Sequence, residues 1–449
     1  MACKLHVAMQ GRIDATKLFS DKLWGLLKKS NWIRALWDPQ LGIYHCGPLA
    51  GTSSSMTEIV NSIHGAKDTE GQSPPVGYGI AGWHVDDCTA LVCDVNWDLD
   101  HKSNRVARFL RGTIEVIYAT TMTAWHGKKA LGFTLMLNES LETVNMSAPD
   151  SLSQLCDSML KDSVTFTPKH AMTAEFEGIA PGIVPDVGDP ERDSVLARMA
   201  QTRHALGVLI WMCNAYSEGV APTHLLCSNM AYPSEVTLKC ARYLVMHLKH
   251  YAKGITFGGW GNCNGLERPE NDDDLIAPYT EGRKAMYYHF FSDASLKVSG
   301  TGKPASVTGG VGMLAGGPIQ TIAQSQHLAS PDSHTSEVVA AGVNLSLIVP
   351  VNGVLQELGI RLGRSCPFYL DSKTTVFVAM SDAAVKKSVW LLRRVAVLTD
   401  GTNSGEISPI HISEKHMVAD PCTKYLPQVV WAKHMKYMLN HAGHLSSWD

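Results

Sequence analysis

The stretch Tyr287-Tyr288-His289-Phe290-Phe291-Ser292-Asp293 decides the expected fold of the C-terminal part of this 449-residue chain. Aromatic-rich runs favour β-strands, so we predict a strand over 287–293. We predict further strands over 307–314 and 319–325, in the residues leading to Asp371, and over 407–412. A helical run over 337–358, with a break at Pro350, separates the first three strands from the rest. Three consecutive strands followed by alternating helix and strand predict an α/β domain, a mixed sheet with helices on its faces.

Four acidic residues lie along this predicted domain. Asp293 ends the first strand, Glu337 opens the helical run, Asp371 follows a short apolar run, and Asp420 precedes Pro421. Clustered carboxylates repel one another unless a cation lies between them, and hard oxygen ligands suit Mg²⁺ or Mn²⁺. Two such ions about 4 Å apart stabilise the attacking and the leaving oxygen in phosphodiester hydrolysis. We therefore expect the four acids to converge on a site for two Mg²⁺ or Mn²⁺ ions.

The composition indicates an ordinary globular protein, with 45% hydrophobic and 18% charged residues. No uninterrupted apolar run approaches the length of a membrane span, the longest lying near Ala205–Cys213. The N-terminus lacks the apolar core of a secretory signal. The eleven cysteines form no CxxC pair, which argues for reduced thiols and against a zinc site. We expect an intracellular protein, cytoplasmic or nuclear, that is not secreted and has no membrane partner.

The N-terminal part carries one motif of interest. Apolar residues at helical spacing predict an amphipathic helix over 14–28, and a helix followed by strands is expected over 104–138. Two apolar runs over 76–94 predict a β-hairpin with Asp86 and Asp87 at its tip. Such a paired-acid tip is either an exposed turn without chemistry or part of a metal site.

Residues 194–262 are predicted to be helices joined at Ala221-Pro222 and Tyr232-Pro233, after a proline- and glycine-rich break over 179–190. This segment holds six Lys and Arg against two acids, a balance that suits either a phosphate backbone or a solvated helix face. Its candidates for nucleic-acid contacts are Arg242 and Lys249.

The C-terminal domain offers a second basic group. Between residues 286 and 427 there are 11 Lys and Arg against 10 acids, so the domain is net basic once the four expected ligands are set aside. Its densest cationic group is Lys386, Lys387, Arg393 and Arg394. These four are candidates for contacts to a nucleic-acid backbone, and the alternative is again a solvated helix face.

Four segments carry a family resemblance: Ser292-Asp293-Ala294-Ser295, Thr335-Ser336-Glu337-Val338, Leu370-Asp371-Ser372 and Ala419-Asp420-Pro421-Cys422-Thr423-Lys424-Tyr425-Leu426-Pro427. In this order they resemble the SDAD, STEAEY, DN and ADxxTKPLP motifs of the ribonuclease H of copia-type LTR retrotransposon polyproteins. The resemblance implies a ribonuclease H-like mixed five-stranded sheet with flanking helices. It also implies metal ligation by the four acids and cleavage of the RNA strand of RNA–DNA hybrids. His416 matches a region where a histidine aids product release in related enzymes; as a lone histidine, it is alternatively a surface or capping residue.

Upstream, Val85-Asp86-Asp87 resembles the YVDD hairpin of the same family's reverse transcriptase, with His84 in place of the tyrosine. The polymerase also needs a third Asp on an earlier strand, and fingers, which are expected to be absent here. We predict no polymerase activity for this chain alone. Completion by another chain, such as the missing N-terminal part of the polyprotein, is a further possibility.

The resemblance implies five segments: a reverse-transcriptase palm remnant (1–178), a basic helical thumb or connection (179–264), an acidic linker (265–285), the ribonuclease H-like domain (286–427) and a helical tail (428–449). The leading hypothesis is a hybrid-cleaving ribonuclease that binds RNA–DNA hybrid or other nucleic acid. The alternative is an inert retroelement fragment that acts as a nucleic-acid-binding or structural protein. The departures His84, Ser295 and Val338 from the family motifs favour this alternative.

Overall fold

The structure is a computed structural model. It describes residues 32–34, 41–45, 78–84, 87–93, 128–130, 132–137, 143–160, 167–258, 288–296, 306–327, 330–357, 365–381 and 389–440. The chain divides into two compact units. The first comprises Met1–Gly132 and Val349–Gly363, and the second comprises Phe133–Ile348 and Arg364–Asp449.

The first unit contains a four-stranded antiparallel sheet in the order β1-β2-β3-β4. Its strands are β1 Trp32–Arg34, β2 Leu41–His45, β3 Tyr78–His84 and β4 Asp87–Cys93, and a short strand β5 follows at Lys128–Ala130. The hairpin predicted over 76–94 is confirmed, with His84 paired to Asp87 across the turn. Asp87 therefore begins a strand. Asp86 and the predicted helix over 14–28 lie outside the described residues.

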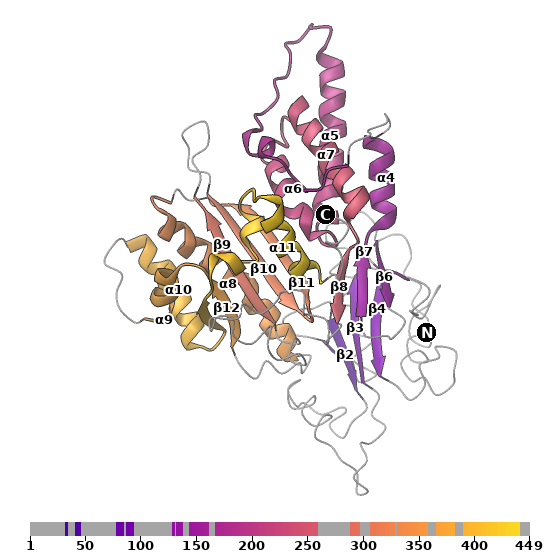
Figure 1. Cartoon of the computed structure of the whole chain (residues 1–449). Coiled ribbons are helices and arrows are strands. Elements are labelled where there is room, and N and C mark those ends of the chain that lie inside the picture. Colours follow the sequence, from indigo (N-terminus) through magenta and orange to yellow (C-terminus); the bar gives the residue numbers. More distant parts are fainter. Residues whose placement is uncertain are drawn as a thin grey trace, which may run out of the picture. The chain divides into compact units, whose positions relative to one another are not determined.

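A five-stranded mixed sheet organises the second unit, in the order β11-β10-β9-β12-β13 (Figure 1). Its strands are β9 His289–Ser295, β10 Val307–Leu314, β11 Gly317–Ser325, β12 Cys366–Leu370 and β13 Ile407–His411. The first three pair antiparallel, and β12 runs parallel to both β9 and β13. The predicted α/β class, with a mixed sheet and helices, is thereby confirmed.

The helix α8 Ser333–Glu357 connects β11 to β12 and differs from its prediction at both points of detail. It begins before residue 337, because the Asp332 carboxylate accepts a hydrogen bond from the backbone N–H of Thr335 at 2.7 Å and so caps the helix N-terminus. It also continues through Pro350, where a break was expected. The early start places Glu337 inside the helix.

By length and composition alone, α8 is also apolar enough to cross a membrane, because an 18-residue window within Ser333–Gln356 has a mean hydropathy of 1.9. The expectation that nothing in the chain approaches a membrane span was therefore wrong on those criteria. More than half of this stretch is buried within the protein, and Asn344 on the same helix donates hydrogen bonds to Ser292 of β9 and to the Gly309 carbonyl of β10. These are the properties of a helix that packs on a sheet.

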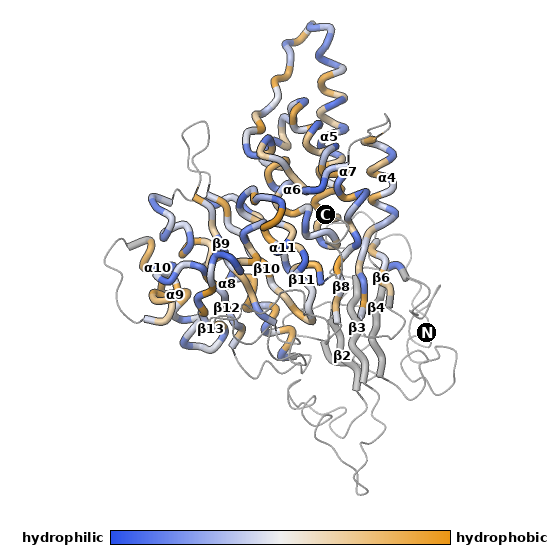
Figure 2. The backbone as a smooth tube through the Cα atoms, in the orientation of Figure 1, coloured by the Kyte–Doolittle hydropathy of each residue, from blue (hydrophilic) through white to orange (hydrophobic). Residues whose placement is uncertain are grey.

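A helical layer with a small antiparallel sheet precedes the five-stranded sheet in the second unit. Its elements are β6 Phe133–Leu137, β7 Thr143–Ser147, α4 Pro149–Met159, α5 Arg192–Met212, α6 Val220–Cys227, α7 Glu235–Tyr251 and β8 Ile255–Gly258. Figure 2 shows hydrophilic and hydrophobic residues alternating along α4 and α7, as the helical periodicity of amphipathic helices requires.

Two details of the predicted helical segment are corrected. Ala221 and Pro222 lie inside α6 and do not join two helices, since proline is tolerated in the first helical turn. The residues Ile255–Gly258, expected to be helical, form β8, which pairs with β7. The joint at Tyr232-Pro233 is confirmed, and Ser234 there forms a capping box at the start of α7.

The remaining helices of the described residues lie mostly in the C-terminal half. They are η3 Ala174–Gly178, η4 Ser217–Gly219, α9 Lys373–Met380, α10 Val389–Asn403, η5 Glu414–His416, η6 Asp420–Cys422 and α11 Gln428–Leu439. One hydrophobic core joins the helical layer to one face of the sheet and to α11, with Leu206, Leu244, Val311, Phe291 and Trp431 among its members.

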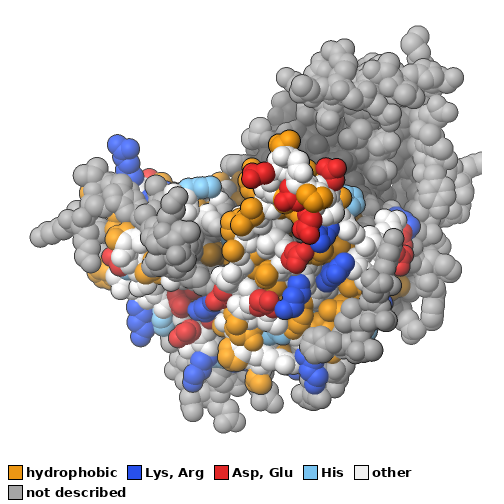
Figure 3. Space-filling model, turned by 90° about the horizontal axis from the view of Figure 1, so that it is seen from above, with side chains coloured by type: hydrophobic (Ala, Val, Ile, Leu, Met, Phe, Trp, Pro, Cys, Tyr) orange, Lys and Arg blue, Asp and Glu red, His pale blue; other side chains and the backbone are white. Residues whose placement is uncertain are grey.

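The surface of the helical layer is less basic than the residue count suggests. Arg198 forms an ion pair with Glu235 at 3.1 Å, and Lys239 forms one with Glu175 at 3.0 Å. On the face that Figure 3 shows, cationic and acidic side chains are interspersed. The two nucleic-acid candidates on α7, Arg242 and Lys249, are both exposed.

Candidate metal centre

The five-stranded sheet brings two of the predicted acids to adjacent positions. In the parallel pair β9 and β12, Leu370 lies opposite Ser292. The next residue on each strand is an acid, so Asp293 and Asp371 follow side by side. Asp293 lies within β9 and does not end it, a correction to the prediction, whereas Asp371 directly follows β12 as expected.

The third acid comes from α8. An oxygen of Glu337 accepts a hydrogen bond from the backbone N–H of Ala294 at 3.3 Å, which ties the second turn of α8 to β9. One carboxylate oxygen from each of Asp293, Glu337 and Asp371 lies within 4.8 Å of the others. We call these three residues the acidic trio. Oxygen atoms at this mutual distance can hold a metal ion.

The trio is removed from water to different degrees. Asp293 is 1% exposed and Glu337 is 8% exposed, whereas Asp371 is half-buried. Burial, followed by the charges of Asp293 and Asp371, raises the pKa of Glu337 to about 10. Burial and the charge of Asp293 raise the pKa of Asp371 to about 6. Without a cation, Glu337 therefore holds a proton at neutral pH that a bound metal ion would displace.

One unsatisfied atom supports a cation at the trio. Among the described residues, the second carboxylate oxygen of Glu337 (Oε2) is buried and has no hydrogen-bond partner. Buried polar atoms are nearly always paired, because an unpaired one costs about 1–3 kcal/mol. A divalent ion between the three carboxylates would satisfy this oxygen. The donor set, three carboxylates without sulfur or imidazole, is the kind that Mg²⁺ and Mn²⁺ prefer.

Asp420 lies beside the trio but not among its close ligand atoms. It begins η6, is 3% exposed, and forms an ion pair with the Lys424 ammonium at 3.0 Å. Burial first, and then the charge of Asp293, raise the pKa of Asp420 to about 8, and Lys424 opposes this shift. Burial lowers the pKa of Lys424, but Asp293 and Asp420 outweigh it and leave that pKa raised.

The segment 420–424 is fastened to β9 by polar contacts. The Thr423 hydroxyl donates a hydrogen bond to Oδ2 of Asp293, and the Ser295 hydroxyl donates one to the Thr423 carbonyl at 2.9 Å. Ser295, where the family motif has an acid, thus has a structural contact here. In the sequence, Thr423 and Lys424 are parts of a motif, and no separate role was predicted for them. Their polar and cationic side chains, three and four residues after Asp420, were the signal for a role at the site.

A glycine makes this fastening possible. Gly309 of β10 lies directly opposite Asp293. A Cβ atom added at Gly309 would lie 2.5 Å from a methyl carbon of Thr423 and 3.1 Å from the Ala419 carbonyl. The segment 419–424 therefore reaches Asp293 only because this residue has no side chain.

His416 is buried in η5 and was expected to act at the site. It lies near His434 of α11, since its charge contributes to lowering the pKa of His434 to about 4, after burial and Lys433. A part in product release remains a prediction.

The other predicted residues are spread over the chain. Arg393 is exposed and Arg394 is half-buried on α10, whereas Lys386 and Lys387 lie outside the described residues. In the first unit, Asp87 begins β4, and Asp86 lies outside the described residues. The sequence interpretation gave no role to Glu218, a buried acid of η4.

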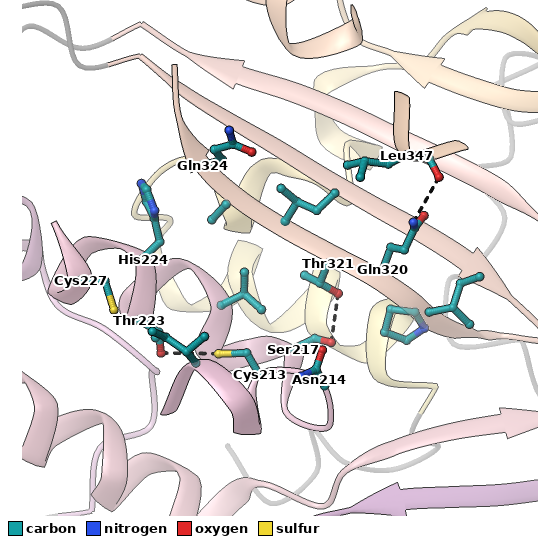
Figure 4. A pocket seen from close by; sticks show the side chains of 16 residues that line it. Cys213, Asn214, Ser217, Thr223, His224, Cys227, Gln320, Thr321, Gln324 and Leu347 are labelled. Carbon is teal, nitrogen blue, oxygen red and sulfur yellow. Dashed lines mark hydrogen bonds between the residues drawn. The ribbon is translucent and has the colours of Figure 1, made fainter. Parts of the chain in front are cut away.

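A groove of about 550 Å³ lies between α5, α6 and the edge strand β11 (Figure 4). Inside it, the Thr321 hydroxyl donates a hydrogen bond to the Ser217 hydroxyl at 3.1 Å. His224, which also lines the groove, forms a hydrogen bond with Ser325 at 3.3 Å. Its lining contains no Lys, Arg, Asp or Glu, and none of the four acids borders it. A groove without charge does not suit a phosphate backbone or a metal ion, so the trio is the better candidate site.

No protein-family model matches this chain, and no curated protein matches its sequence.

Proposed function

We propose that this protein is a metal-dependent ribonuclease of the ribonuclease H type, which cleaves the RNA strand of RNA–DNA hybrids. The observation that carries the proposal is the convergence of Asp293, Glu337 and Asp371, whose ligand atoms lie within 4.8 Å of one another. Their origin from a central strand, the crossover helix and the adjacent parallel strand supports a ribonuclease H-like sheet. The motif resemblance to copia-type retrotransposon polyproteins supports the same assignment and the same ancestry.

Asp293, Glu337, Asp371 and Asp420 are the residues that would hold the cofactor, two Mg²⁺ or Mn²⁺ ions. Bound divalent ions supply the Lewis acidity that phosphodiester hydrolysis needs. Asp293 is central to the ligand set because it belongs to the trio and its charge also acts on Asp420. Its orientation is fixed by the Thr423 hydroxyl. Glu337 is positioned by the backbone N–H of Ala294.

The half-buried Asp371 lies on the accessible side of the trio and is the acid best placed to meet a substrate phosphate. Arg393 and Arg394 on α10 are proposed to contact the backbone of a bound hybrid, together with Lys386 and Lys387. Recognition of the RNA strand would rest on its 2′-hydroxyl groups, which distinguish RNA from DNA. The proposed setting is intracellular.

The purified chain and its Asp371→Asn variant test this proposal on a labelled RNA–DNA hybrid with Mg²⁺ or Mn²⁺. We expect metal-dependent cleavage of the RNA strand and at least about a hundredfold loss in the variant, because a metal ligand supplies several kcal/mol of transition-state stabilisation. The matched control is Glu218→Gln, which neutralises a buried acid away from the trio. Equal cleavage by all three proteins would contradict the proposal.

The expectation that this chain alone has no polymerase activity is retained as part of the proposal. Templated, Mg²⁺-dependent primer extension by the purified chain would contradict it. Primer extension that appears only when a second chain is added would support completion by a partner. An inert nucleic-acid-binding fragment, the alternative hypothesis, predicts hybrid binding with no cleavage by the wild-type chain.

A further inference from the structure

The four acids are not equally open to a cation. On the trio side, the buried Oε2 of Glu337 has no hydrogen-bond partner among the described residues, and Asp371 is half-buried. On the Asp420 side, groups of the protein itself already lie against two of the carboxylate oxygens. The Thr423 hydroxyl donates a hydrogen bond to Oδ2 of Asp293, and the Lys424 ammonium forms an ion pair with Oδ1 of Asp420 at 3.0 Å.

Lys424 is well held in this place. Its side chain is 30% exposed, while the partner Asp420 side chain is 4% exposed. An ion pair with one buried partner is screened little by water, so removing the ammonium leaves a buried charge uncompensated. The adjacent Thr423 is fixed by Gly309 and by the Ser295 hydroxyl, so the segment that carries Lys424 has little freedom to withdraw.

We propose that Lys424 is a built-in counter-cation that takes the place of a second divalent ion, so that the protein without nucleic acid binds a single divalent ion, at the trio. This inference rests on the proposed metal-dependent function and specifies its cation site. Once metal binding has ionised all four acids, one divalent ion and one ammonium balance three of the four negative charges. A second divalent ion would have to displace the ammonium from Asp420.

Calorimetric titration of the purified chain with Mn²⁺ alone measures how many ions each chain binds. We expect one ion per wild-type chain and two per chain in the Lys424→Met variant, because methionine is unbranched and nearly as long as lysine but carries no charge. Lys424→Arg keeps the charge and should bind one ion. The matched control is Lys239→Met, which removes the lysine of an exposed ion pair of the same 3.0 Å length.

Electron paramagnetic resonance of the wild-type chain with excess Mn²⁺ gives a second readout that does not depend on the variants folding. An isolated ion supports the inference, and a spin-coupled Mn²⁺ pair overturns it. One ion in both the wild type and a folded Lys424→Met variant also overturns it, and leaves the proposed function standing. No specific Mn²⁺ binding by the wild type would overturn the proposed function and the inference with it.

Discussion

The second unit buries carboxylates at η4 and at the trio, and the surroundings of the carboxylates differ between these two places. Glu218 of η4 is 3% exposed, and its Oε2 has no hydrogen-bond partner among the described residues. Burial raises the pKa of Glu218 to about 7, opposed by its own backbone N–H, and no neighbouring carboxylate contributes to that shift. In the trio, Asp293 and Asp371 add to burial and raise the pKa of Glu337 to about 10.

The difference separates a buried acid from a metal site. A single proton relieves Glu218, because no acid among the described residues contributes to its pKa shift. Glu337 and Asp371 face other acids, and Lys424 is a cation set among them. Burial alone therefore does not identify a functional acid. The convergence of several acids from separate elements, with a lysine in contact, distinguishes the trio and Asp420.

The largest predicted effect concerns the isolated acid. Its folded-state pKa of about 7 lies above the ordinary value of 4.5, so the unfolded chain releases the proton first. Glu218 therefore makes the protein lose stability as pH rises from about 4.5 to 7, by roughly 3 kcal/mol. Urea unfolding of Glu218→Gln in saturating Mg²⁺ should lack this loss. If Glu218→Gln lost as much stability over this pH range as the wild type, the raised pKa of Glu218 would be contradicted.

The trio should respond to metal where Glu218 does not. Mn²⁺ at about 100 times its Kd stabilises a protein that binds it only when folded by about 2.7 kcal/mol. We expect this gain, measured by thermal unfolding, in the wild type and in Glu218→Gln, and its loss in Asp293→Asn. An equal gain in Asp293→Asn would show that the ion binds elsewhere.

Without metal, the trio should destabilise the fold. The pKa of Asp371 is raised from 3.8 to about 6, so its ionisation lowers stability as pH rises through that window. At pH 8 in EDTA, the free energy of unfolding of Asp371→Asn should exceed that of the wild type by about 1–2 kcal/mol, after allowance for the partial exposure of Asp371. In Mg²⁺ the order should reverse. A variant less stable than the wild type in both conditions would contradict mutual repulsion.

The smallest effect concerns Thr423. Valine keeps the methyl group that packs against Gly309 but loses the hydroxyl that donates to Asp293. A hydrogen bond to a charged group contributes about 1.5 kcal/mol or somewhat more, so Thr423→Val should lower stability in Mg²⁺ by about that amount. The comparison is Thr202→Val, whose buried hydroxyl donates to the carbonyl of Arg198 in α5 and should matter less. Equal losses of stability in the two variants would show that the hydrogen bond to Asp293 contributes no more than one to a backbone carbonyl.

The sequence predicted most of the strands that carry the site, since β10 has the predicted bounds and β12 ends immediately before Asp371. It also predicted the three acids of the trio. Hydrophobic runs predict strands well because the pattern is local in the sequence. The prediction that distant acids meet depended on the order of the family motifs, and therefore on the resemblance.

Other features depend on contacts that a sequence does not display. The start of α8 is set by the Asp332 cap, and the strand at Ile255–Gly258 by its pairing with β7. The spacing of four residues places Lys424 within reach of Asp420. The burial of the Asp420 carboxylate in this pair depends on tertiary packing and could not be predicted. Glu218 shows the converse, an acid whose environment comes entirely from tertiary packing.

The segment that packs against Gly309, which includes Thr423, also determines when the site is completed during synthesis of the chain. The three acids of the trio can meet as soon as β12 has paired with β9, whereas Asp420, Thr423 and Lys424 emerge later from the ribosome. A nascent chain thus has an incomplete pocket until its last helices are made. Shortening the chain before residue 420 would remove Lys424 together with core residues of α11 such as Trp431, so the site and the packing of its sheet depend on the same late segment.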